Sequence, residues 1–492
     1  MLIQNLLGTV NYRCSRRPYI QLMQGLLRIV PLGGLGEVGK NMMAIQHDED
    51  IVIVDSGVMF PRDEMRGIDL VIPDTSFLIE HRSLVRGVLI THGHEDHTGA
   101  LPYLLRDLEV PVYAPALAHD LITVKLREHA PLHGGDLRKV SPGDRITLGT
   151  FEIEYFSVCH SIPDACGLAI RTKAGLVVHT GDFKIDQTPV DGRTTDLDRL
   201  EALGKEGVLL LLSDSTYAEV EGYTPSEAVV GTALKRIVRE APGRVLVATF
   251  ASLIARVQQI IDAASEVGRS VAVTGRTMTD NVTMGLEKGY LQAKPGVIKR
   301  LDELARLSPD RQTIVMTGAQ GEPFAVLAQV ASGNNHQLSI EPDDTIVVSA
   351  STIPGNERAV ADVIDGLTRL GATVLTRLTV PDVHVPGHAH REELKQMLAL
   401  VKPRYFVPIH GEYRMLAAHA QLAADDGIPE DNIFILEDGD VLELDRSFAH
   451  VVDSVPAGHV YVDGNRLWGA GSPVLRDRRT LSRDGFVAVV VP

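Results

Sequence analysis

The segment Thr91–Gly99 reads THGHEDHTG and follows an apolar, strand-like run. It places three imidazoles and two carboxylates within six consecutive positions. His92 and His94 lie two residues apart, so on an extended turn their side chains point the same way. His92 and His94 can therefore bind one metal ion together. Asp96 and His97 come next, where they can begin a helix and face a second ion. This density of metal-binding groups after a buried strand is not typical of a surface loop, and it predicts a site for two metal ions.

Four protein ligands do not complete two metal sites, so further ligands are expected along the chain. Three candidates each follow a strand-like apolar run: His160 after Tyr155–Cys159, Asp182 after Val177–Thr180, and His410 after Tyr405–Ile409. Taken singly, each is more typical of a structural polar residue at a strand end. Taken together and in this order, they supply the ligands that the first segment lacks.

The pattern of strands and helices changes twice along the 492 residues, a length that suggests two or three domains. The first 200 residues contain short β-runs broken by Gly, Pro and Asp, which is typical of a layered α/β unit. From about Ser226, strands and helices alternate as in a doubly wound domain. From Arg369, short strands and histidine-bearing loops return, so the middle domain is predicted to be inserted into the first.

Composition narrows the class of protein. No apolar run approaches the roughly 18–20 residues of a membrane span. The net charge of −16, from 48 basic and 64 acidic residues, argues against a protein that coats polyanions, although a nucleic-acid enzyme can hold one strand with metal ions and local cations. Cys14, Cys159 and Cys166 form no C-x-x-C pair, so we expect a reducing cytoplasm and no cysteine-based zinc site.

Gly34, Gly36 and Gly39 match the glycine spacing of a dinucleotide-binding fingerprint, and Asp55 lies at a suitable distance along the chain for a ribose contact. That fingerprint requires a helix immediately after the glycines. Residues 41–46 and 51–55 have the pattern of strands instead. We therefore expect no nucleotide cofactor, and we expect the glycines to shape a tight turn near the metal site.

The ordered set of candidate ligands resembles that of the metallo-β-lactamase superfamily. The middle domain and the late histidines resemble its β-CASP branch, in which the ribonuclease J family is the best match. The resemblance runs from about Leu27 to the end of the chain. Its supporting strings are Pro31–Asn41 (PLGGLGEVGKN), Ile90–Gly99, His160–Asp164 (HSIPD), Gly181–Lys184 (GDFK), Thr317–Pro323 (TGAQGEP), Ser351–Glu357 (STIPGNE), His388–Ala389 and His410–Tyr413 (HGEY).

The resemblance implies an α/β fold, namely a metallo-β-lactamase αββα sandwich with an inserted doubly wound β-CASP domain. The implied units are an N-terminal extension expected to be disordered (1–25), the first part of the metallo-β-lactamase domain (26–216), the inserted β-CASP domain (217–368), the second part of the first domain (369–447), and a linker with the truncated start of a C-terminal region (448–492).

Seven residues match metal ligands of the family by position: His92, His94 and His160 for one metal, Asp96, His97 and His410 for the other, and Asp182 as a bridge. Neutral imidazoles suit zinc, and carboxylates suit zinc or manganese. Two divalent ions per chain are therefore expected, with Zn²⁺ as the first choice and Mn²⁺ as the alternative. Two such ions about 3.5–4 Å apart can hold a hydroxide for in-line attack on phosphorus and neutralise the developing charge.

Three positions match the motifs of the β-CASP branch. Asp214 matches the acid of the first motif, His388 the histidine of the second, and His410 the third, which is His in RNA-acting members and Val in DNA-acting ones. The resemblance therefore implies single-stranded RNA as the partner. The expected catalytic residues are Asp96 and Asp182 at the metals, Asp214 orienting a histidine or the water, and His388 stabilising the phosphate or protonating the leaving 3′-oxygen.

Two donor-rich turns in the middle domain suit a phosphate cradle of backbone N–H groups. The expected substrate-binding residues are Ser349, Ser351, Thr352, Gly355 and Asn356 in one turn, Thr317, Gly318 and Gln320 in the other, and Gly387 and His388 nearer the metals. By resemblance, the turns receive a 5′-monophosphate, which favours 5′-to-3′ exonuclease action, with endonuclease activity as well, in mRNA decay and rRNA maturation. The alternative is that both are ordinary loops.

The chain departs from the family in two places. Pro386 stands where family members commonly have Ser, which removes a hydroxyl and a backbone donor that could touch a phosphate. The chain also ends near where the family's C-terminal domain, which supports dimer formation, should begin, so the expectation of a homodimer is weakened. An RNA-decay assembly and a cytoplasmic location are further expectations from the resemblance.

Two alternatives from other classes stay open on the sequence. One is a small-molecule hydrolase acting on a thioester or a lactam, although a small substrate needs no large middle domain. The other is a non-catalytic RNA-binding paralogue, which would be expected to have lost metal ligands that this chain keeps.

Overall fold

The computed structural model describes residues 25–62, 65, 67–128, 136–322, 325–352, 356–464, 466–469 and 472–485. The expected N-terminal extension, Cys14 included, lies outside these residues apart from Gly25. Cys159 and Cys166 are buried free thiols. Among the described helices, none is long and apolar enough to cross a membrane.

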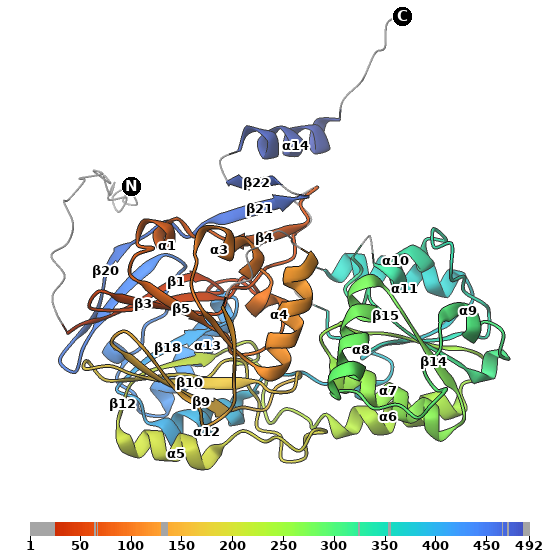
Figure 1. Ribbon diagram of the computed structural model, residues 1–492, viewed down its shortest axis with the longest axis horizontal. Helices are drawn as coiled ribbons and strands as arrows, with labels where there is room; N and C mark the ends of the chain where they lie inside the picture. Colours follow the sequence, from red (N-terminus) through yellow and green to blue (C-terminus); the bar gives the residue numbers. More distant parts are fainter. Residues whose placement is uncertain are drawn as a thin grey trace, which may run out of the picture.

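Two sheets face each other in the described part of the first domain (Figure 1). The larger has, among those residues, eight strands in the spatial order β20 (Ala449–Ser454), β19 (Asp440–Leu444), β1 (Leu27–Gly33), β2 (Met42–His47), β3 (Asp50–Val54), β5 (Val85–Leu89), β6 (Val112–Pro115) and β7 (Leu137–Val140). The smaller has, on the same basis, six strands in the order β18 (Tyr405–Ile409), β12 (Val208–Asp214), β11 (Leu176–His179), β10 (Cys166–Arg171), β9 (Phe151–Ser157) and β8 (Arg145–Leu148). Because β18 lies beside β12, the chain leaves this domain and returns to it.

Apolar side chains of both sheets meet in one core, in which Ile45, Val52, Ile153 and Leu210 are fully buried. Each such side chain contributes about 1.5–3 kcal/mol by leaving water. Helices cover the two outer faces: α3 (Leu101–Asp107) and α4 (Ala116–Glu128) on the larger sheet, and α5 (Leu197–Glu206), α12 (Arg391–Val401) and α13 (Tyr413–Asp425) on the smaller one. The predicted αββα sandwich is confirmed.

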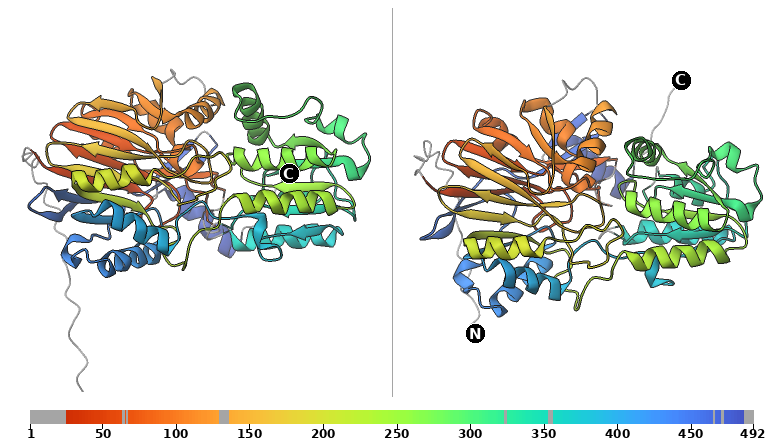
Figure 2. Two further views of the ribbon diagram at one scale, coloured as in Figure 1. Left: turned by 90° about the horizontal axis from the view of Figure 1, so that it is seen from below. Right: turned by 60° about the horizontal axis from the view of Figure 1, so that its bottom comes forward.

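A third sheet lies in the segment between β12 and β18. Its described strands are parallel, in the order β14 (Ser270–Thr274), β15 (Gln312–Met316), β13 (Val245–Ala248), β16 (Thr345–Val348) and β17 (Thr373–Leu375). One face packs against α6 (Ala228–Glu240), α7 (Ile254–Glu266) and α8 (Arg276–Lys288), and the other against α10 (Val326–Ala331) and α11 (Glu357–Arg369). Figure 2 shows helices on both faces of this sheet. The predicted doubly wound insertion is confirmed.

Two boundaries that the sequence predicts are wrong. It predicts a return to the first domain at residue 369, but β17 pairs with β16 and so extends the inserted sheet to Leu375. It also predicts a separate C-terminal region from residue 448. Instead, β20 pairs with β19, and β21 (His459–Asp463) pairs with β4 (Leu70–Pro73). β17 has only three residues and β20 is mostly exposed, so neither carries the apolar run that marks a buried strand.

The glycine-rich segment is followed by a strand, as the sequence predicts. β2 begins at Met42, directly after this segment. Gly39 has a φ of 99°, and a Cβ at this position would lie 3.1 Å from the carbonyl oxygen of Val58. The glycine therefore allows two backbone segments to approach closely beside the segment Thr91–Gly99.

Arg256 on α7 ties the inserted domain to the segment that leads back to the first domain. Its side chain is buried and forms an ion pair with Glu227. It also bonds to the hydroxyl of Ser349, and its Nη1 donates to the carbonyl of Val383 at 3.2 Å.

We expect Arg256→Met to lower the free energy of unfolding by about 3–5 kcal/mol, because the Glu227 carboxylate stays buried without its partner. Chemical denaturation followed by circular dichroism measures this change. Arg300→Met is the matched control, since the Arg300 side chain is 80% exposed, and it should change stability by less than about 0.5 kcal/mol. A loss for Arg256→Met as small as that of the control would contradict the prediction.

Candidate metal centre

The ligand-rich segment lies at the carboxyl end of β5, between the parallel strands β3 and β6. Asp55, directly after β3, accepts hydrogen bonds from the backbone N–H and from the hydroxyl of Thr91, each at 2.8 Å. These bonds fix the start of the segment. His94 is extended and is the N-cap of the short helix α2 (Glu95–Thr98). The segment thus changes from extended to helical between its first and second pairs of candidate ligands.

His92, His94, His160 and Asp182 form the first cluster. Nδ1 of His94 lies 3.1 Å from Nε2 of His92 and 3.1 Å from Nε2 of His160. Oδ2 of Asp182 lies 3.6 Å and 3.7 Å from the same two Nε2 atoms. Nitrogen ligands about 2.0–2.1 Å from a tetrahedral zinc ion lie about 3.4 Å apart, so these separations fit one such ion.

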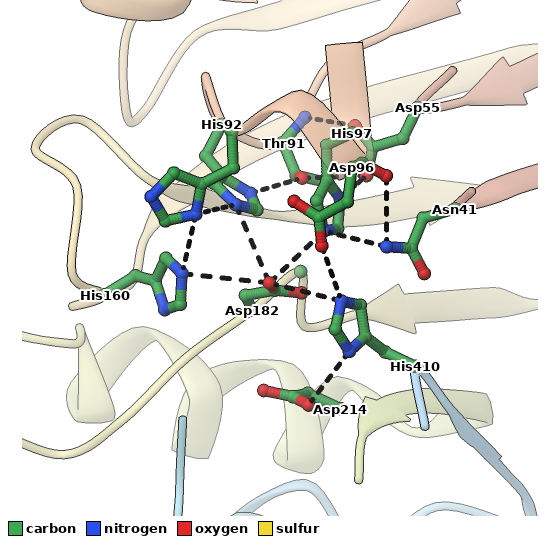
Figure 3. Close-up of polar contacts among 12 residues, drawn as sticks. Asn41, Asp55, Thr91, His92, Asp96, His97, His160, Asp182, Asp214 and His410 are labelled. Carbon is green, nitrogen blue, oxygen red and sulfur yellow. Dashed lines mark hydrogen bonds and ion pairs between the residues drawn. The ribbon is translucent and has the colours of Figure 1, made fainter. Parts of the chain in front are cut away.

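Asp96, His97, His410 and again Asp182 form the second cluster. Nε2 of His97 lies 3.6 Å from Oδ2 of Asp96 and 3.2 Å from Oδ2 of Asp182. Nε2 of His410 lies 3.3 Å and 3.5 Å from the same two oxygens. Asp182 lies between the two clusters, as Figure 3 shows. The structure therefore brings all seven predicted ligand residues together around one shared carboxylate.

Hydrogen bonds outside the clusters orient two of the histidines. Nδ1 of His97 lies 2.8 Å from a carboxylate oxygen of Asp55, and Nδ1 of His160 lies 2.8 Å from the carbonyl oxygen of Gly387. Both acceptors require the proton to sit on Nδ1. In the neutral form of each ring, Nε2 is then the unprotonated nitrogen and can bind a cation.

Thr216 orients His410 in the same way. Nδ1 of His410 lies 2.6 Å from the hydroxyl oxygen of Thr216, whose own proton goes to a carboxylate oxygen of Asp214 at 2.8 Å. The hydroxyl therefore accepts from His410 and donates to Asp214. In the neutral form of His410, Nε2 is therefore the unprotonated nitrogen, and it faces Asp96 and Asp182.

Burial sets the charge state of the first cluster. It lowers the pKa of His92 and of His160 well below the ordinary value for histidine, and it lowers the pKa of His94 to about 4. These three rings are therefore neutral near pH 7, as metal ligands must be.

The second cluster attracts positive charge. Burial opposes the charged form of His97 and of His410, but the carboxylates of Asp182 and Asp96 outweigh it. The pKa of His410 rises to about 9, and that of His97 rises well above its ordinary value. A divalent cation can supply the same positive charge in place of these protons. The donor set, the spacing and the electrostatics of the two clusters thus all fit divalent metal ions.

Asp214, which is buried, and His388, which is half-buried, form a pair beside the second cluster. Nδ1 of His388 lies 2.8 Å from Oδ2 of Asp214. Oδ1 of Asp214 accepts from the backbone N–H of Thr216 at 3.0 Å and from its hydroxyl. Burial opposes charge on His388, but Asp214 outweighs it and raises the pKa of His388. His388 therefore holds a proton more firmly than a free imidazole does, and its Nε2 remains for a substrate.

A cavity of about 1010 Å³ is lined by residues of both domains. It exposes Asp96, Asp182 and His388 of the first domain together with Thr317 and Ser351 of the inserted domain. Four more of the predicted substrate residues line it as well: Gly318, Thr352, Asn356 and Gly387. The predicted phosphate turns and the metal clusters therefore share one cavity.

Three predicted substrate residues are placed differently. Ser349 is fully buried and its hydroxyl donates to the Val383 carbonyl at 2.6 Å, so it is not available as the predicted phosphate contact. Gln320 is also buried, and its side-chain amide donates to the carbonyl of Ser351 at 2.7 Å. This bond stabilises the turn that contains Ser351. Gly355 lies outside the described residues.

The sequence did not reveal three residues that hold the ligands in place: Asp55, Thr216 and Asn41. The signal that Asp55 and Thr216 carry in the sequence is their position just after an apolar run; that these strands neighbour ligand-bearing ones, β3 beside β5 and β12 beside β18, is seen only in the structure. The amide of Asn41 donates to the backbone carbonyl of Asp96 at 3.1 Å. No pattern in the sequence points to that contact.

Known domain families match successive parts of the chain. Residues 35–205 match the metallo-beta-lactamase superfamily, residues 242–367 match the beta-CASP domain of ribonuclease J, and residues 375–435 match the Zn-dependent metallo-hydrolase RNA specificity domain. The beta-CASP match covers most of the segment that forms the third sheet.

The chain is similar to ribonucleases J over nearly its whole length. It is 44% identical over 471 residues to ribonuclease J 1 of Streptococcus pyogenes, and this alignment covers 96% of this chain and 84% of that protein. Identity is 41% over 465 residues to ribonuclease J2 of Bacillus subtilis (94% and 83%) and 44% over 474 residues to ribonuclease J of Thermus thermophilus (95% and 82%). A crystal structure of a protein of unknown function from Enterococcus faecalis matches with a TM-score of 0.60 at 18% identity, over 85% of this chain and 100% of that one, which supports the fold alone.

Proposed function

This chain belongs to the ribonuclease J family and is a metal-dependent ribonuclease, and from that premise we propose that it uses two divalent ions to degrade single-stranded RNA from the 5′ end. The observation that carries the proposal is the position of Asp182. Its Oδ2 lies within 3.7 Å of ring nitrogens from both clusters. Imidazole-rich sites favour Zn²⁺, with Mn²⁺ as the alternative. The small-molecule alternative is not favoured, because the near-full-length relatives are ribonucleases J.

Two ions held by these residues would neutralise the charge of the scissile phosphate and lower the pKa of the attacking water. Residues beside the two metal clusters would position the general acid, His388. His388 is held through Nδ1 by Asp214, and Asp214 raises its pKa. Nε2 of His388 would therefore donate its proton to the 3′-oxygen as the P–O3′ bond breaks. The downstream product would carry a 5′-phosphate.

The preference for a 5′ end rests on the two turns of the inserted domain. Thr317 follows β15 and Ser351 follows β16, so both lie where the carboxyl ends of parallel strands meet, the usual ligand-binding edge of an open α/β sheet. Nη1 of Arg377 lies 3.2 Å from the hydroxyl of Ser351 and brings a positive charge to this turn. A terminal phosphate bound there would place an internal phosphodiester at the metals, because both sites share one cavity.

We expect RNA with a 5′-monophosphate to be shortened at least about 10-fold faster than the same RNA with a 5′-hydroxyl, since hydrogen bonds to a charged group contribute about 1.5–3 kcal/mol. Digestion of 3′-labelled RNA bearing a hydroxyl, a monophosphate or a triphosphate measures the preference. Ser351→Ala should reduce it, whereas Ser332→Ala, an exposed serine of the same domain, should not. Equal rates for all three ends would contradict the 5′-to-3′ proposal and favour endonuclease action.

A homodimer and an RNA-decay assembly stay predictions. The same holds for a cytoplasmic location and for roles in mRNA decay and rRNA maturation.

A further inference from the structure

Tyr217 lies beside His388 without belonging to either metal cluster. It comes three residues after Asp214, in the turn that follows β12, and it lines the same cavity as His388. Its ring is nearly parallel to that of His388, with the ring centroids 6.0 Å apart and 28° between the planes. It also stacks on His390, at 5.5 Å and 29°. The side chain is only half-buried, so it offers aromatic surface to the cavity.

The two histidines are already held by other groups. His388 is fixed by the bond from its Nδ1 to Asp214. His390 is the N-cap of α12, and its backbone N–H donates to the Glu393 carboxylate at 2.9 Å. Among the described residues, the Tyr217 hydroxyl forms no hydrogen bond. The histidines thus fix the plane of the tyrosine ring, and the ring is not needed to fix theirs.

We propose that Tyr217 is the stacking platform for a nucleobase directly flanking the scissile phosphate, which makes it a specificity-determining residue of this ribonuclease. The inference rests on the proposed placement of that phosphate between the metal clusters and His388. A base attached to a neighbouring sugar can reach the Tyr217 ring, because this ring and that of His388 are only 6.0 Å apart.

Stacking on an aromatic ring would also determine which form of RNA the site accepts. Every base has a π-face, so a tyrosine platform holds any sequence. A base inside a duplex has both faces covered by its neighbours, and it must leave the helix before it can stack on a side chain. Tyr217 would therefore favour single-stranded RNA without selecting among bases.

The test compares the wild-type holoenzyme with Tyr217→Leu and Tyr217→Phe on 5′-monophosphorylated RNA in which one nucleotide at a time is abasic. On intact RNA, we expect Tyr217→Leu to lower kcat/KM on the order of 10-fold, mainly through KM, and Tyr217→Phe to retain it. An abasic site at the stacked position should lower kcat/KM of the wild type by a similar factor. It should leave kcat/KM of Tyr217→Leu almost unchanged, because the substitution and the abasic site remove the same contact. Tyr223→Leu is the control, since Tyr223 is 66% exposed in the same loop.

A second readout does not depend on turnover. 2-Aminopurine at the stacked position of a cleavage-resistant phosphorothioate RNA should lose fluorescence on binding to the wild type and to Tyr217→Phe, but not to Tyr217→Leu. If the effects of Tyr217→Leu and of an abasic site on kcat/KM were additive at every position, and if the fluorescence change were the same for all variants, this inference would be overturned while the proposed function would stand. A wild-type enzyme that cleaved none of these RNAs would overturn the proposed function and this inference together.

Discussion

Asp182→Asn is expected to lower kcat/KM for RNA by about 10³-fold or more. The substitution keeps the shape of the side chain but removes the charged oxygen that faces both clusters. Loss of several kcal/mol of charge stabilisation in the transition state corresponds to roughly this factor. Elemental analysis of the same preparation should find fewer than two metal ions per chain.

Asp302→Asn serves as the matched control for this substitution. The Asp302 side chain is 57% exposed in the inserted domain, away from the clusters, so metal content and rate should both stay at the wild-type level. An Asp182→Asn enzyme that kept two ions per chain and the full rate would contradict the role of Asp182 as a shared ligand.

His388→Gln is expected to lower kcat by about 10²–10⁴-fold, the usual contribution of a general acid. Metal content and RNA affinity should change little, because Nδ1 of His388 is bonded to Asp214 and His388 belongs to neither of the two clusters described above. Single-turnover kinetics and elemental analysis separate these effects. His450→Gln, an exposed histidine on β20, is the control and should leave all three quantities unchanged.

RNA with a 3′-sulfur at the scissile bond distinguishes the two roles proposed for His388. A thiolate leaves without a proton, so the defect of His388→Gln should largely disappear on this substrate if the residue acts as an acid. A defect of the same size with sulfur and with oxygen would contradict the acid role and assign His388 to holding the phosphate.

The fold was predictable wherever strands are buried. The run Tyr405–Ile409 coincides with β18, and the apolar run before Thr91 contains β5. Prediction failed at β17 and β20, because edge strands that are short or exposed need no apolar run and are fixed by hydrogen bonds to a neighbour. Pairing between distant segments is a tertiary property that local sequence patterns do not carry.

The ligand positions were predictable for a different reason. Most of them lie in one short segment, and the others each come at a strand end, so local spacing already indicates them. Asp55 and Thr216 depend instead on which strands lie side by side, and that is decided by packing. Ser349 was predicted as a substrate contact because it lies directly after β16, and this prediction was wrong. Its hydroxyl is instead hydrogen-bonded to the buried Arg256 and to the Val383 carbonyl.

The most direct test of the central claim is a metal titration of stripped protein. Zinc or manganese is added back in steps, and bound metal per chain and hydrolysis of 5′-monophosphorylated RNA are measured in the same samples. We predict no hydrolysis in the stripped protein and a full rate only as bound metal approaches two ions per chain, since Asp182 joins both clusters. A full rate at one ion per chain or fewer would contradict a two-metal ribonuclease.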